Sequence, residues 1–76
     1  MGNYVVGFTI TDDESSRSAR LYFAGLSEGL DMASEPDMAI KCLKKNGEEI
    51  AVWLKSQEFP GMSDIRIEPY ESTPSR

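Results

Sequence analysis

The chain has 76 residues, enough for one small domain that buries only about 60% of the surface its unfolded form exposes. Eight lysines and arginines against thirteen aspartates and glutamates give a net charge of −5, which repels phosphate backbones and argues against direct nucleic-acid binding. The sequence has no histidine and one cysteine, Cys42, which excludes an internal disulfide, a histidine-activated nucleophile and the usual zinc ligand sets.

No apolar run of about 18 residues and no signal peptide is present, so we expect a cytoplasmic protein without a membrane anchor. Glycine-rich phosphate loops are absent, and the acidic run at residues 12–14 lacks the alternating ligands of a calcium loop. We therefore expect no enzyme activity, no metal and no cofactor. A monomer and a small homo-oligomer are both compatible with the sequence.

The first predicted element is a strand over residues 3–11, rich in β-branched and aromatic residues. Alternation places four apolar side chains on one of its faces, namely Tyr4, Val6, Phe8 and Ile10. The polar run at residues 12–16 predicts a turn.

The segment over residues 18–26 fits two structures. Ala19, Tyr22 and Phe23 have helical spacing, whereas Leu21 and Phe23 alternate with polar neighbours as in a strand. Because Gly25 weakens a helix and the acidic turn precedes the segment, we favour a strand that forms a hairpin with the first.

Residues 27–37 form a predicted acidic loop that contains glycine, serine and proline. Leu30 and Met32 are apolar residues within this loop, which also carries Glu28, Asp31, Glu35 and Asp37. A short third strand is predicted over residues 38–43.

The clearest helix signal lies over residues 46–57, where Asn46 is a candidate N-cap and Glu49 follows three residues later. Its predicted apolar face contains Ile50, Trp53, Leu54 and Gln57, so we expect Trp53 to be largely buried. A second interpretation ends a helix at Asn46 and Gly47 and makes the following residues a strand.

Ile65 and Ile67 alternate with charged residues in a predicted strand over residues 63–70, with Pro69 at its end or on an open edge. A polar tail at residues 71–76 is predicted to be disordered. The predicted fold is a small α+β domain over residues 1–70. It has an antiparallel sheet of three to four strands with one main helix on one face, in the order β-β-β-α-β.

Six short motifs in this order resemble a group of small phage- and prophage-encoded β-β-β-α-β proteins, most of them without an assigned role. The motifs are Tyr4-Val5-Val6, Leu21-Tyr22-Phe23-Ala24-Gly25, Glu35-Pro36-Asp37, Glu48-Glu49, Trp53-Leu54 and Ile65-Arg66-Ile67-Glu68-Pro69, and the single residues Ala39 and Lys41 belong to the same pattern. The chain departs from the group in having Cys42 or Leu43 where an aromatic residue is usual, and in a longer spacing from there to Glu48. Proteins of this size from mobile elements include anti-CRISPR inhibitors of bacterial defence systems, so the resemblance implies a binding role.

We therefore expect a non-catalytic protein that binds a protein partner, for which a phage-encoded inhibitor is one candidate role. The carboxylates of the acidic loop would steer it toward a basic partner, such as a nucleic-acid-binding protein. The predicted contact residues are Glu28, Leu30, Asp31, Met32, Glu35 and Asp37. An alternative interpretation folds Leu30 and Met32 back over the sheet. An acidic mimic of nucleic acid and an accessory subunit of a larger assembly are the alternative functions.

Overall fold

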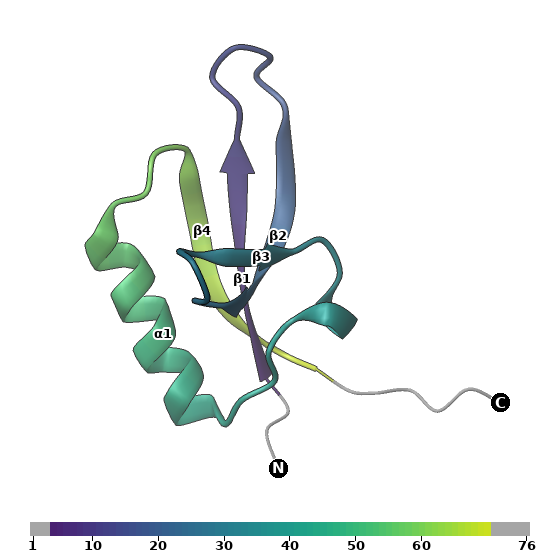
Figure 1. Cartoon of the computed structure of the whole chain (residues 1–76), viewed down its shortest axis with the longest axis vertical. Coiled ribbons are helices and arrows are strands. Elements are labelled where there is room, and N and C mark those ends of the chain that lie inside the picture. The colour runs from purple at the N-terminus through teal and green to yellow at the C-terminus, as the bar shows by residue number, and fades with distance from the viewer. Residues whose placement is uncertain (1–3, 71–76) are drawn as a thin grey trace, which may run out of the picture.

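The computed structural model describes residues 4–70. Within this range the elements are β1 (Tyr4–Thr11), β2 (Ser18–Gly25), β3 (Asp31–Ala33), the 3-10 helix η1 (Pro36–Met38), α1 (Lys44–Gln57) and β4 (Met62–Pro69). The strands form one antiparallel sheet in the order β3-β2-β1-β4, and α1 packs against β1 and β4 (Figure 1). The predicted α+β fold, with the order β-β-β-α-β, is therefore confirmed. The prediction for the tail at residues 71–76 lies outside the described residues.

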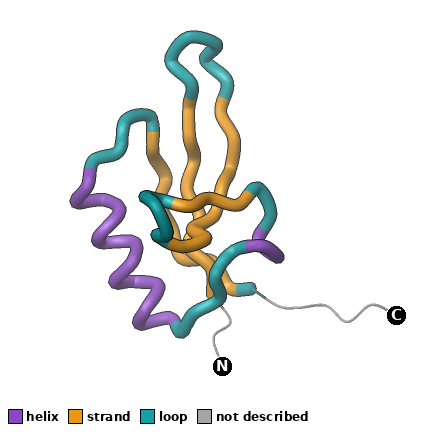
Figure 2. The backbone as a smooth tube through the Cα atoms, viewed as in Figure 1, coloured by secondary structure: helices purple, strands orange, loops and turns teal. Residues whose placement is uncertain are grey.

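The β1–β2 hairpin confirms the strand interpretation of residues 18–26. Phe8 pairs with Leu21, and Thr11 pairs with Ser18 at the end of the ladder. The turn beyond it is closed by a 2.7 Å hydrogen bond in which the Asp12 amide donates to the Arg17 carbonyl. Figure 2 shows this turn extending beyond the end of α1.

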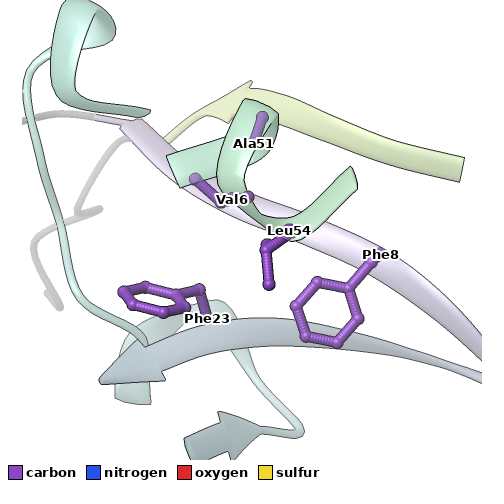
Figure 3. Close-up of a cluster of buried hydrophobic side chains, with 5 residues drawn as sticks. All are labelled: Val6, Phe8, Phe23, Ala51 and Leu54. Atoms are coloured by element: carbon purple, nitrogen blue, oxygen red, sulfur yellow. The ribbon is translucent and has the colours of Figure 1, made fainter. Parts of the chain in front are cut away.

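The core lies between α1 and one face of the sheet, which we call the helix face. Leu54 is fully buried and projects from α1 toward Phe8 of β1 and Phe23 of β2 (Figure 3). Val6 and Ala51 complete this buried cluster, and partly buried side chains of β4 pack around it. Val6 and Phe8 both reach this cluster because every second residue of β1 points to the same face of the sheet.

The opposite face of the sheet, which we call the open face, carries a polar network centred on Arg20. Its guanidinium donates to the Thr9 hydroxyl at 3.2 Å and to a Glu68 carboxylate oxygen at 2.5 Å. The network passes over Gly7, where an added Cβ would lie 3.0 Å from Arg20 Nη2 and 3.2 Å from Glu68 Oε2. Gly7 therefore leaves the space in which a β2 cation reaches a β4 carboxylate.

The position of the third strand differs from the prediction. It lies at Asp31–Ala33, inside the segment predicted to be loop, and the predicted strand over residues 38–43 forms no regular strand. That segment follows η1 and makes a single antiparallel bridge between Cys42 and Tyr4, with an added bond from the Ile40 amide to the Phe23 carbonyl. One bridge satisfies the backbone there, but it is too short to extend the sheet.

The start of the helix also differs from the prediction. Helix α1 begins at Lys44 after Leu43, so Asn46 is not its N-cap and Gly47 does not end a helix. Gly47 is buried in the first turn, where an added Cβ would lie 3.3 Å from an Ile67 methyl carbon and 3.4 Å from the Cys42 sulfur. Close packing of this turn against β4 thus outweighs the local capping signal.

The buried face of α1 is rotated from the predicted one. It contains Gly47, Ala51 and Leu54, whereas Trp53 is 36% exposed and only partly covered. The Trp53 ring meets Phe59 edge to face, with 6.0 Å between ring centroids. The prediction that Trp53 is largely buried is therefore wrong. Two small residues let the helix approach the sheet closely, which turns the bulky indole toward the side.

We expect Leu54→Ala to lower the free energy of unfolding by about 3 kcal/mol or more, because it opens a cavity at the centre of the core. Val52→Ala is the matched control, since Val52 is 65% exposed on the same helix. The control should cost less than about 1 kcal/mol. Urea denaturation measures both values, and equal losses would contradict the assigned helix face.

Candidate protein-binding surface

An apolar groove lies between α1 and the end of β2. Its volume is about 200 Å³, and its walls are Phe23, Leu26, Ile50 and Trp53, with Glu49 as the single charged residue of the lining. Leu26 is 54% exposed and Trp53 is 36% exposed, so both side chains can be reached from solvent. Tryptophan in a partly open apolar pocket is typical of the anchoring positions of protein interfaces.

Two apolar residues of the predicted contact loop lie on the helix face, in different environments. Met32 pairs with Phe23, which places its side chain on the face that carries the groove, and it is 48% exposed. Leu30 is partly buried and packs against the core cluster. For Leu30 the structure therefore has the alternative arrangement considered above, in which the side chain covers the sheet. We call Leu26, Met32, Ile50 and Trp53 the Trp53 surface.

The four acidic residues of the predicted contact set do not gather at one place. Asp31 stabilises its own loop, because its carboxylate accepts from the Ser27 amide at 3.2 Å and from the Ser27 hydroxyl at 2.8 Å. Glu28 is exposed in the same loop, and Glu35 is exposed where η1 begins.

Asp37 belongs to a different cluster, built around Tyr70. Its carboxylate accepts from the Tyr70 hydroxyl at 2.5 Å, and its backbone carbonyl accepts from the Lys41 ammonium. That ammonium lies 4.8 Å from the centre of the Tyr70 ring. These contacts tie η1 to the end of β4, so Asp37 has a structural partner within the chain.

Sequence reasoning missed three of the four members of the Trp53 surface. Leu26 lies in a segment whose sequence fits both a helix and a strand, and apolar spacing predicts that Ile50 and Trp53 belong to the buried face of the helix. The pattern that identifies the true buried face is Gly47, Ala51 and Leu54, spaced i, i+4 and i+7. Because two of these residues are small, that pattern has little weight in a hydropathy-based prediction.

Cys42 is a partly buried thiol beside the first turn of α1. Its sulfur lies 3.5 Å from the Tyr4 carbonyl oxygen, to which the thiol can donate. Burial raises the pKa of Cys42 above its ordinary value, because desolvation disfavours the thiolate. The thiolate is the nucleophilic form, so this environment does not activate the residue.

Within residues 4–70, no three histidine, cysteine, aspartate or glutamate side chains come together in a group that could hold a metal ion. Over the same range, none of the helices has the length and apolar character needed to cross a membrane.

The chain matches no protein-family model, and comparison with curated proteins and with solved structures gives no match.

We expect iodoacetamide to alkylate Cys42 of the folded protein more slowly at neutral pH than a free cysteine, and at an ordinary rate in urea. The raised pKa also predicts a pH dependence of stability. At neutral pH the thiol is protonated in both states, whereas above its ordinary pKa the unfolded state ionises first, so stability falls as pH rises. Rapid alkylation of the native protein at neutral pH would contradict this assignment.

Proposed function

We propose that this protein acts without catalysis, by binding another protein through the Trp53 surface. The observation that supports the proposal most directly is the groove lined by the buried Phe23 and by the partly exposed side chains of Leu26 and Trp53. Exposed apolar side chains grouped in this way are typical of interaction sites, because a partner removes their surface from water.

The surroundings of the groove support a basic partner. Glu49 lines it, Glu28 is exposed in the adjoining loop, and the whole chain carries a net charge of −5. Charges at the rim of an interface mainly raise the association rate, whereas buried apolar anchors mainly lower the dissociation rate. On this account Glu28 and Glu49 steer the partner, and Leu26, Met32 and Trp53 hold it.

The biological role that we propose is inhibition of a bacterial defence protein by occlusion, as in anti-CRISPR proteins. This part of the proposal rests on the resemblance to small phage-encoded proteins described above. A basic nucleic-acid-binding protein would suit both the acidic rim and the net charge of the chain. The inhibitor would then work in the cytoplasm of the infected cell.

An acidic mimic of nucleic acid has less support. Mimicry needs unpaired carboxylates spread over one face, but Asp64 and Glu68 on the open face both form ion pairs with Arg20. Asp12 and Asp31 accept hydrogen bonds inside their own loops. The remaining carboxylates are therefore a weak imitation of a phosphate backbone.

The test starts from a photo-crosslinking amino acid placed at position 26 and bacterial lysate as the source of partners. The captured protein is then purified, and its affinity for the intact chain is measured by calorimetry. We expect Leu26→Ser and Met32→Ser each to weaken binding about tenfold or more, since truncated anchors cost over 1 kcal/mol. Neither variant should lower the melting temperature substantially, because both side chains are about half exposed.

Met38→Ser is the matched control, because it removes a 73% exposed apolar side chain from η1, outside both proposed sites. It should bind like the unaltered protein. Unchanged affinity in both Leu26→Ser and Met32→Ser would contradict the proposal. Binding that falls steeply with salt and ignores these two substitutions would instead favour the nucleic-acid mimic.

A further inference from the structure

We propose that the outer edge of β4 and the adjacent side of α1 bind an extended segment of a partner protein, which adds a strand to the sheet. The segment we infer has an apolar, acidic, apolar pattern at its centre. The site differs from the Trp53 surface, so the two proposals stand or fall separately. In Figure 1 this edge lies beside α1, where β4 ends the sheet formed by the described residues.

Hydrogen bonding along β1 shows which backbone groups of β4 face outward. The amide and carbonyl of Tyr4 both bond to Cys42, on the β2 side of β1, whereas the Thr11 amide bonds to Gly61, on the β4 side. Backbone groups alternate along a strand, so those of Val6 point toward β2 and away from its β4 partner, Ile67. The amide and carbonyl of Ile67 therefore point out of the sheet.

The helix supplies a wall beside these outward backbone groups. A groove of about 410 Å³ runs between α1 and β4, and Val52 forms part of it together with Ile65 and Ile67. Val52 is 65% exposed, and nothing in the core accounts for an apolar residue at this position. An added strand would cover Val52 with the side chains that it directs to the helix face.

The exposed charge of Arg66 favours an acidic residue at the centre of the bound segment. Arg66 lies opposite Gly7 on the β1–β4 ladder, and its side chain points to the open face, where it is 63% exposed. One contact, 2.8 Å from its Nη2 to an Asp64 carboxylate oxygen, leaves most of its donors available. Glu48 and Lys55 of α1 both line the groove on the helix side, so their opposite charges favour neither sign there. A carboxylate directly opposite Arg66, between two apolar residues opposite Ile65 and Ile67, matches this arrangement.

A second copy of the chain fits this edge poorly. An antiparallel pair centred on Arg66 would place two like charges opposite each other, which is destabilising. A pair centred on Ile67 would place Pro69 opposite Ile65, and proline has no amide to donate. Asp64, with φ of 53°, lies in a bulge opposite Phe8 and limits regular pairing beyond Ile65. The edge is therefore suited to a short segment of a different sequence.

The test uses the intact chain, isotopically labelled, and a short capped peptide with a central Val-Glu-Val flanked by threonines. We expect amide resonances of Ile65 and Ile67 to shift during an NMR titration, and hydrogen exchange of the Ile67 amide to slow about tenfold at saturation. A peptide with central Val-Lys-Val should bind about tenfold more weakly, because its charge is repelled by Arg66.

Two variants distinguish this site from other contacts. Arg66→Glu should reverse the preference between the two peptides, whereas Arg17→Glu, the same change in the exposed hairpin turn, should leave it unaltered. Val52→Lys should abolish peptide binding without lowering the melting temperature. Absence of shifts at Ile65 and Ile67 with both peptides, or equal binding of the two, would overturn the proposal. So would shifts confined to the Trp53 surface, or shifts at the β4 edge that depend on protein concentration without peptide.

Discussion

The contact of Leu54 with the sheet is the interaction on which the rest of the structure depends. Leu54 is fully buried against Phe8, and Phe23 closes the same cluster from the next strand (Figure 3). Burying a leucine completely is worth about 1.5 to 3 kcal/mol, a large share of the few kcal/mol expected for so short a chain. One helix and one face of the sheet thus supply the main apolar cluster, while Val5, Ala33 and Ala39 are buried outside it.

This docking determines which side chains remain available on the surface. Because Gly47 and Ala51 bring α1 close to β4, the neighbouring residues Val52 and Trp53 flank the contact and do not enter it. Trp53 then faces the end of β2, and Val52 faces the open edge of β4. Both proposed binding sites therefore follow from which side of α1 packs against the sheet. On the open face, the ion pairs of Arg20 occupy carboxylates that would otherwise be free to meet a partner.

The sequence predicts the fold better than it predicts the site. Alternation in β1 and in β4 identified both strands and the residues that face α1, because a period of two is a strong local signal. It did not predict that Val5, on the other face of β1, is buried. The third strand was missed because Asp31–Ala33 is three residues long and depends on pairing with β2. The helix start was misplaced because Asn46 offered a local cap, whereas the real start follows from the Tyr4–Cys42 bridge and the packing of Gly47. Such distant contacts leave no local pattern, and the exposure of Trp53 follows from them.

Fluorescence quenching of Trp53 tests the central claim most directly, because it is the only tryptophan in the chain. The account predicts that the acrylamide quenching constant of the folded protein is a substantial fraction of the constant measured in urea. It also predicts an emission maximum at wavelengths typical of a partly hydrated indole. Val52→Ala should leave both values unchanged. Emission typical of an apolar interior, with negligible quenching in the folded state, would place Trp53 in the core and contradict the account.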